Sequence, residues 1–304
     1  MDKKEFLKRS VGALDASGFF QTSSGGAAVN PNIWDYNLKK FIEQSIVVTP
    51  LAEQIDFRSP GVDFKVTIDL APSIATVQTD TAEVSVSSFS TRNLTMTPLE
   101  YGARYQLTKG EAVRAFFNVA EKMVGKLGYS MAQKKESLAI TCLTASTNNV
   151  IVNSKTAVTA IASTDTFNVA LLTSGIQKMK LKYYKPKYLI INPVMENALF
   201  NTTNLYKANE FGTRDVIANG YISTLFGVQI FVSDVLSTST SAKAILLGET
   251  KTGEKAFGYC VKRDPVIERQ YFAATRLWDI VGTEEYGFSL FHEDAVWTLQ
   301  CYAA

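Results

Sequence analysis

Residues 108–138 have the sequence TKGEAVRAFFNVAEKMVGKLGYSMAQKKESL and carry the strongest structural signal of the chain. The first four residues, Thr108-Lys109-Gly110-Glu111, match the capping box, in which a hydroxyl and a carboxylate satisfy the first free amides of a helix. Apolar side chains then recur at helical spacing on one face. They are Val113, Phe116, Phe117, Ala120, Met123, Val124, Leu127, Met131 and Leu138. The pattern predicts a helix over residues 111–146, about 54 Å long at 1.5 Å per residue. That is about three times the usual length of a helix in a globular domain.

Two strand patterns and a segment poor in core residues precede this helix. Residues 62–70 alternate apolar and polar side chains, which predicts a half-buried strand, and a second alternation covers residues 101–107. The residues between them are mostly Ser, Thr, Val and Ala. A two-stranded excursion with so few large apolar side chains is marginally stable by itself. We therefore expect this segment to lie against a neighbouring surface.

The first 45 residues do not predict a compact domain. Residues 2–15 have the pattern of a short amphipathic helix, and Pro31 suits the first turn of a second helix. Between them, the small residues Thr22-Ser23-Ser24-Gly25-Gly26-Ala27 are typical of a flexible connection. We interpret this region as an arm, which must find its buried surface against something other than itself.

The second half of the chain alternates helix and strand patterns, as an α/β or α+β domain does. Asp165 is placed to cap a helix that runs to about Lys182, and Asn192-Pro193 is placed to end a strand and start a short helix. The predicted strands are residues 188–191, residues 225–232 with a turn or bulge at Gly227, and residues 244–247 and 256–261 on either side of a turn. A final extended stretch covers residues 266–299, with interruptions predicted near Gly282 and Gly287.

The composition excludes several classes of protein. Apolar residues make up 46% of the chain and charged residues 20%, and 31 basic against 29 acidic groups give a formal net charge of +2. These values exclude an intrinsically disordered chain and a histone-like nucleic-acid binder. The chain starts without a signal-peptide pattern, and its longest uncharged stretches are too polar for a membrane, so we expect a soluble protein without membrane contact. Three scattered cysteines favour a reducing compartment.

Patterns typical of enzymes are weak or missing. No G-x-G-x-x-G pattern occurs, and residues 248–255 have the spacing of a phosphate-binding loop but place Glu254 where a lysine is needed. The single histidine excludes every site that needs two. His292-Glu293-Asp294 could supply a base with carboxylate support, but no paired nucleophile is identifiable, and a polar turn before the last strand is the simpler interpretation. We expect a protein without catalytic residues, cofactor or metal.

One basic segment is a candidate for nucleic-acid contact. It interleaves two tyrosines with the lysines Lys178, Lys180, Lys182, Lys185 and Lys187. Lysines at this density can contact phosphates. Lysines are also favoured at the C-terminal end of a helix, where they oppose the helix dipole. A solvated helix end is therefore the interpretation that we favour, and a contact with nucleic acid is the alternative.

Four local patterns resemble, in the correct order, the sequences of tailed-phage major capsid proteins. Residues 188–194 (YLIINPV) resemble the strand-to-helix N-P turn of that family. Residues 224–234 (TLFGVQIFVSD) resemble its L-hydrophobic-G-x-P-V-x-x-S-D strand, with Gln229 where proline is usual. Residues 246–249 (LLGE) resemble its x-x-G-D turn with Glu for Asp, and residues 291–297 (FHEDAVW) resemble its closing R-x-D-A-F strand with His292 in the basic position. Together they make a specific resemblance to the Hong Kong 97-like capsid fold, which encapsulin nanocompartments share.

The resemblance implies an α+β protein with the Hong Kong 97-like capsid fold. That fold consists of an N-terminal arm, an extended β-hairpin loop, a long spine helix, a peripheral domain and an axial domain. The implied boundaries are residues 1–40 for the arm, 41–60 for the entry to the peripheral domain, 61–107 for the extended loop, 108–150 for the spine helix and peripheral domain, 151–263 for the axial domain, 264–292 for the return strands of the peripheral domain, and 293–304 for the closing strand of the axial domain.

By this resemblance, we expect a structural major capsid protein that forms pentamers and hexamers and assembles into an icosahedral or prolate shell around double-stranded DNA. Its partners would be other copies of itself, the packaged DNA by non-specific contact, a portal, and separate scaffolding or decoration proteins, because the arm is too short to include a large scaffolding segment. It would be located in the virion after assembly in the host cytoplasm. An encapsulin-type shell is the nearer alternative, and a soluble enzyme or a phage tail component is the more distant one.

The same resemblance indicates which residues would form the contacts. Contacts between subunits are expected at Phe6, Trp34, Phe41, Val62, Phe64, Val66, Tyr101 and Tyr105. If the shell holds DNA, the basic residues expected to face it are Lys3, Lys4, Lys8, Arg9, Lys178, Lys180, Lys182, Lys185 and Lys187.

Overall fold

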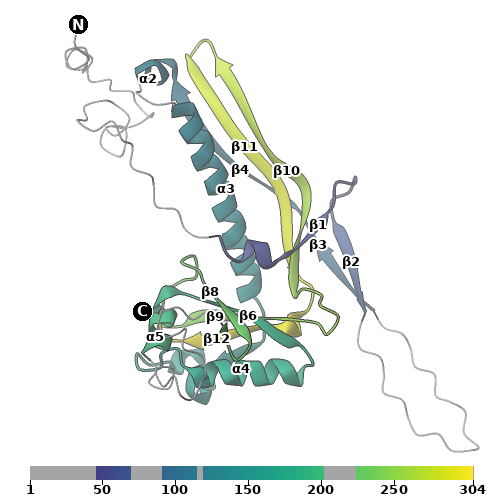
Figure 1. Cartoon of the computed structure of the whole chain (residues 1–304). Helices are drawn as coiled ribbons and strands as arrows, with labels where there is room; N and C mark the ends of the chain where they lie inside the picture. Colours follow the sequence, from purple (N-terminus) through teal and green to yellow (C-terminus); the bar gives the residue numbers. More distant parts are fainter. Residues whose placement is uncertain (1–45, 70–90, 115–118, 202–223, 304) are drawn as a thin grey trace, which may run out of the picture. The chain divides into compact units, whose positions relative to one another are not determined.

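The computed structural model describes residues 46–69, 91–114, 119–201 and 224–303 (Figure 1). The chain divides into two compact units, which we describe separately. The described part of the first unit comes from residues 100–114, 119–135 and 264–285. The described part of the second comes from residues 46–69, 91–99, 136–201, 224–263 and 286–303.

The first unit is built around the first part of helix α3 (Val119–Thr144). One face of this helix packs against strands β4 (Leu99–Thr108) and β11 (Leu277–Leu290). The buried side chains of this cluster are Leu107, Val119, Met123, Leu127, Met131 and Ile280. The apolar face that the sequence predicts is therefore the buried face, and Figure 1 shows α3 lying along the strands.

The predicted capping box starts a helix. Glu111 Oε2 accepts hydrogen bonds from the Thr108 amide (3.1 Å) and hydroxyl (2.7 Å), and the Glu111 amide donates to the Thr108 hydroxyl at 3.2 Å. The helix it starts is α2 (Lys109–Arg114), and α3 follows from Val119. The helix predicted over residues 111–146 is described as α2 and α3, on either side of residues 115–118, which lie outside the described residues and include Phe116 and Phe117.

A four-stranded sheet has the order β1-β10-β11-β4. It includes β1 (Glu53–Asp56) and the long strand β10 (Phe257–Phe272), and β1 pairs in parallel with β10 over Gly258–Val261. The interruptions predicted at Gly282 and Gly287 are wrong, because β11 continues through both positions. A Cβ at Gly282 would lie 2.1 Å from Leu127 Cδ2, and a Cβ at Gly287 would lie 2.7 Å from the Thr97 carbonyl oxygen. Close packing, rather than a break in the strand, accounts for these glycines.

The second unit contains a six-stranded mixed sheet with the order β5-β12-β9-β6-β8-β7. The strands are β5 (Asn149–Ile151), β6 (Lys185–Ile191), β7 (Thr224–Leu225), β8 (Val228–Val232), β9 (Ala242–Glu249) and β12 (Val296–Cys301). Helix α4 (Val169–Leu181) packs on this sheet, and Asn192 caps α5 (Pro193–Phe200) through a hydrogen bond from the Met195 amide at 2.8 Å. The core includes Phe167, Leu172, Ile176, Leu189, Ile191, Leu246 and Leu299. The strands and the short helix predicted for this region are confirmed.

The cap predicted for helix α4 is wrong. Asn168, not Asp165, accepts the hydrogen bond of the first turn, from the Leu171 amide at 2.8 Å. Asp165 is buried and accepts hydrogen bonds from the Asn153 amide group (2.7 Å) and the Ala162 amide (2.6 Å), and it forms an ion pair with Lys155. The contact with Lys155 is the main reason that the pKa of Asp165 lies below its usual value. Asp165 therefore holds together the loop before the helix.

Strands β2 (Phe64–Asp69) and β3 (Thr91–Met96) form an antiparallel ribbon in which Phe64 lies opposite Met96 and Asp69 opposite Thr91. The apolar side chains of this ribbon pack on one cluster with Phe57, Cys260 and Phe291. The other face carries exposed polar side chains. The predicted alternation over residues 64–69 is thus confirmed, and residues 70–90 lie outside the described residues.

Candidate assembly surfaces

The residues predicted to join subunits fall into different environments. Val62 is 74% exposed, whereas Phe64 and Val66 are half-buried against the cluster under the β2–β3 ribbon. Tyr105 packs against the α3 cluster of the first unit, and Tyr101 is half-buried with the Lys134 ammonium 5.9 Å from its ring centroid. Val62, Phe64 and Val66 belong to the second unit, and Tyr101 and Tyr105 belong to the first. Phe6, Trp34 and Phe41 lie outside the described residues.

The sequence analysis missed a buried carboxylate that binds the first described residues of the chain. Glu136, on the second half of α3, is 1% exposed and accepts hydrogen bonds from three consecutive amides of the chain. The distances are 2.9 Å from Val47, 2.6 Å from Val48 and 2.8 Å from Thr49, and the Thr49 hydroxyl also donates at 2.7 Å. Charge-assisted bonds of this kind are among the strong ones in proteins. Glu136 therefore anchors residues 47–49 to helix α3.

An exposed apolar patch lies on the hairpin of β10 and β11 in the first unit. Five large side chains, each between 37% and 42% exposed, make up this hairpin patch: Val266, Ile267, Tyr271, Phe272 and Trp278. The Tyr271 and Trp278 rings stack with centroids 4.8 Å apart. Consecutive residues of a strand point to opposite faces, so the patch has apolar side chains on both faces of the hairpin. Clustered exposed apolar side chains mark sites of interaction. The sequence analysis predicted extended structure here but did not identify the exposed side chains as a contact surface.

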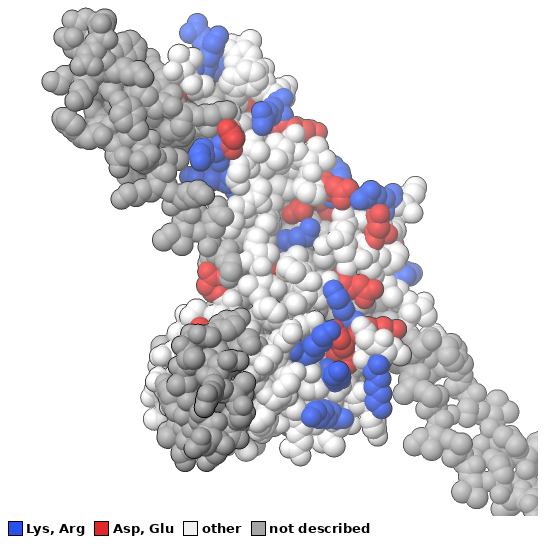
Figure 2. Space-filling model, viewed as in Figure 1, with Lys and Arg blue, Asp and Glu red and all other residues white. Residues whose placement is uncertain are grey.

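The lysine-rich segment is divided by its ion pairs. Lys182 Nζ lies 3.5 Å from Asp294 Oδ1, and Lys187 Nζ lies 2.5 Å from Glu249 Oε1, a contact that raises the pKa of Lys187. Lys178, Lys180 and Lys185 are exposed and form no ion pair with a carboxylate of the described residues. Figure 2 shows basic side chains gathered where α4 ends, with acidic side chains among them. Lys3, Lys4, Lys8 and Arg9 lie outside the described residues.

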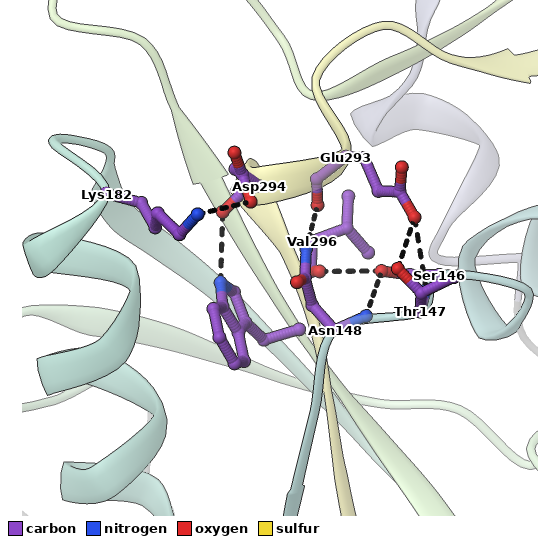
Figure 3. A network of polar contacts seen from close by, with 8 residues as sticks. Ser146, Thr147, Asn148, Lys182, Glu293, Asp294 and Val296 are labelled. Atoms are coloured by element: carbon purple, nitrogen blue, oxygen red, sulfur yellow. Dashed lines mark hydrogen bonds and ion pairs between the residues drawn. The ribbon is translucent and has the colours of Figure 1, made fainter.

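A polar network joins the end of α3 to the turn before β12 (Figure 3). The Ser146 hydroxyl donates to the Val296 carbonyl at 2.9 Å, and the Asn148 amide group donates to the Glu293 carbonyl at 2.9 Å. The Thr147 hydroxyl donates to Glu293 Oε1 at 2.6 Å, which lowers the pKa of Glu293. These contacts fasten two segments that are far apart in the sequence.

The side chains of His292, Glu293 and Asp294 do not converge on one site. His292 Nε2 lies 3.4 Å from Glu254 Oε2, Glu293 bonds Thr147, and Asp294 faces Lys182. Each of the three therefore has a separate partner, which agrees with a polar turn. In the described ranges, no group of three or more His, Cys, Asp or Glu side chains is arranged to hold a metal ion. In the same ranges, no helix combines the length and apolarity needed to cross a membrane.

Comparisons with known proteins agree on one architecture. A family model described as "Phage capsid protein" matches residues 93–299, which is more than half of the chain. No curated protein sequence matches the chain.

Several solved structures have the same fold at low sequence identity. A chain from Mycobacterium phage Che8 is 14% identical with a TM-score of 0.70, over 88% of this chain and 96% of that chain. A chain of the capsid structure of the Cyanophage P-SCSP1u is 15% identical with a TM-score of 0.72, over 92% and 95%. A chain of the head structure of Helicobacter pylori bacteriophage KHP40 is 10% identical with a TM-score of 0.68, over 89% and 94%. The predicted mixed helix and sheet architecture, with the Hong Kong 97-like capsid fold, is confirmed by these matches.

Proposed function

The chain belongs to the phage capsid protein family, and from this premise we propose that its copies form pentamers and hexamers that assemble into an icosahedral or prolate shell around double-stranded DNA. The family makes this a structural major capsid protein, a component of the virion shell. The pentamers and hexamers, the shape of the shell and its DNA content are our proposal beyond membership of the family. Assembly would take place in the host cytoplasm, and the mechanism would be self-association without a catalytic step.

The hairpin patch is the observation that carries this proposal. Its five side chains leave apolar surface in water on a single copy of the chain. Covering that surface with another copy recovers hydrophobic free energy of roughly 25 cal/mol per Å². A shell made of many identical copies offers such a cover to every subunit, whereas a monomer offers none.

The packing of the β2–β3 ribbon limits which of its residues can contact a neighbouring copy. Its apolar face is already used inside the chain, so only its polar face, its edges and Val62 remain for contacts with a neighbouring copy. We infer that the ribbon continues as the extended loop over residues 61–107 and that residues 1–40 act as an arm. In this assignment residues 151–263 form the axial domain, with the closing strand in residues 293–304.

The net charge of the chain is compatible with close packing of many copies, and we propose DNA and further phage proteins as partners of the shell. A net charge of +2 permits many copies to pack closely, because strong self-repulsion is absent. Contact with DNA would be non-specific, through phosphates. A portal and separate scaffolding or decoration proteins would complete the particle.

The proposal is tested by negative-stain electron microscopy of the purified full-length chain, expressed alone and with its neighbouring gene products. The expected result is closed shells or rings of five and six subunits. Absorbance at 260 and 280 nm on the large fraction of native particles should show nucleic acid inside. Shells that hold protein cargo instead of DNA would indicate an encapsulin-type compartment. A chain that stays monomeric under every condition would contradict the proposal.

A further inference from the structure

We propose that the turn from helix α4 into strand β6, together with the neighbouring β9–β10 turn, is a binding site for the sugar-phosphate backbone of double-stranded nucleic acid. The residues of this backbone site are Lys178, Lys180, Tyr183, Lys185 and Lys251. The inference rests on the proposed function, because it names the surface through which a subunit would touch the contents of the shell.

The ion pairs of the chain separate the lysines that can bind a ligand from those that cannot. Lys182 and Lys187 already face Asp294 and Glu249, so these two charges are compensated within the chain. Lys178, Lys180, Lys185 and Lys251 are exposed, and none forms an ion pair with a carboxylate in the part of the chain that is described. The remaining acidic neighbour, Glu254, faces His292 at 3.4 Å. The site therefore carries a local excess of positive charge, although the whole chain is nearly neutral.

The fold adds Lys251, which the sequence pattern did not include. Lys251 Nζ lies 5.4 Å from the centroid of the Tyr183 ring. In the ladder between β6 and β9, Lys185 lies opposite Glu249, two residues before Lys251. Tyr183, Lys185 and Lys251 consequently lie at the same end of these two strands. On helix α4, Lys178 Nζ lies 5.7 Å from the Trp297 ring centroid.

Tyr183 has a backbone conformation that packing does not explain. Its φ is +66°, in the left-handed region that favours glycine after a helix. The turn closes through hydrogen bonds from the Tyr183 amide to the Lys180 carbonyl at 2.9 Å and from the Tyr184 amide to the Met179 carbonyl at 3.3 Å. The Tyr183 side chain is nevertheless 77% exposed, so it gains no core contacts in return. A strained residue that presents an exposed side chain points to a functional role.

The chemistry of these side chains selects a phosphate backbone. Lysine and tyrosine are among the residues that bond phosphate oxygens and sugars of DNA, and such contacts carry no sequence information. Burying four uncompensated ammonium groups in a protein interface would instead cost desolvation energy. Leu181 lies in the same turn and is 70% exposed, which provides an internal control. A docked second copy would bury Leu181, whereas contact with phosphates does not require it.

The first test measures binding of the full-length chain to a labelled 24-base-pair duplex of arbitrary sequence over a series of KCl concentrations. We expect the triple variant K178Q/K180Q/K251Q to bind at least tenfold more weakly at low salt. The slope of log K against log salt should become shallower by about 2 to 3, because each phosphate contact contributes about 0.9. The matched control is K65Q/K109Q/K122Q, which removes three exposed lysines elsewhere. Equal losses in the two triple variants would overturn the proposal.

The second test separates binding from stability. Y183G removes the side chain and relieves the backbone strain, so we expect its midpoint of thermal unfolding to be unchanged or higher while its affinity for the duplex falls several-fold. L181A should change neither duplex binding nor shell formation. Loss of shells in L181A with unchanged duplex binding would overturn the proposal in favour of a docked copy. Electron microscopy of the lysine triple variant keeps the two proposals distinct. If the variant still forms shells and its unassembled subunits still bind duplex with the full salt slope, only the backbone site is contradicted.

Discussion

The carboxylate of Glu136 accepts a hydrogen bond from the amide of Val48 at 2.6 Å, across 88 positions of sequence. The same carboxylate holds the amides on either side of Val48, so three donors that no helix or strand satisfies share one acceptor group. A buried charge is tolerated when it is fully hydrogen-bonded. This pairing fixes the start of the described chain to helix α3.

Removing this carboxylate should destabilise the second unit. In E136A, three amides lose their acceptor in a buried site, and we expect a loss of about 3 kcal/mol or more in the free energy of unfolding. E136Q keeps one acceptor oxygen, so its loss should be about half as large. Urea denaturation measures both values, and hydrogen exchange at Val48 should become faster. E268A removes an exposed glutamate of strand β10 and should change stability by less than about 0.5 kcal/mol. Equal effects of E136A and E268A would contradict the anchoring role.

Gly287 should not accept a side chain. A Cβ there would lie 2.7 Å from the Thr97 carbonyl oxygen and 3.2 Å from the Pro98 nitrogen, both of which are backbone atoms. We expect G287A to lower the free energy of unfolding by about 1–3 kcal/mol, the usual cost of overpacking. G125A is the control, because no described atom outside its own stretch of helix lies within 4 Å of a Cβ placed there, and alanine is favoured over glycine in a helix by up to about 1 kcal/mol. Thermal unfolding should therefore shift in opposite directions for the two variants, and parallel shifts would count against this packing.

Glu284 should lower the free energy of unfolding as the pH rises, which is the opposite of the usual effect of a carboxylate. Its pKa is raised, chiefly because burial disfavours the charged form, and Lys135 at 3.3 Å offsets this only in part. A carboxyl group with a raised folded pKa binds its proton more tightly in the folded state than in the unfolded state. Its stabilising contribution is therefore present at acidic pH and is lost as the pH rises through the folded pKa.

The variant E284Q tests this dependence. The stability of E284Q relative to the wild type should increase as the pH rises from 4 to 7, as measured by urea denaturation of the subunit. A relative stability of E284Q that is constant or falls over this range would show that the pair with Lys135 outweighs burial.

The hairpin patch should be needed for assembly and not for folding. W278K places a charge in the patch and removes the ring stack with Tyr271, an interaction worth about 0.5–1.5 kcal/mol. We expect subunits that fold, by circular dichroism, but form fewer shells in light scattering and electron microscopy. V194K, at a side chain of nearly equal exposure on α5, is the matched control. Shell formation by W278K at the wild-type rate would exclude the patch as a subunit contact.

Local patterns predicted much of the fold because their causes are local. The hydroxyl and carboxylate of Thr108 and Glu111 lie three residues apart, and they make the reciprocal bonds of a capping box. Asn192 and Pro193 likewise end a strand and start a helix through contacts within four residues. The strands around Gly227 follow from the same kind of short-range signal.

Features that depend on distant partners could not be predicted in this way. Asp165 is a good helix cap by residue type, but it is held by Lys155 and Asn153 on an earlier loop, and Asn168 takes the cap. In the sequence, Gly282 suggests an interruption of the strand. In the structure, the strand continues and glycine is required there because Leu127 of α3 packs against it. The backbone site is a similar case, since Lys251 joins Tyr183 only when β9 is paired with β6.

The position of strand β12 has a consequence for synthesis of the protein. Residues Val296–Cys301 are fully buried and lie between β5, with which they pair in parallel, and β9, with which they pair antiparallel. A growing chain that has not yet reached residue 296 has β5 without its neighbour and one side of β9 open. The sheet of the second unit can therefore close only after these late residues have left the ribosome.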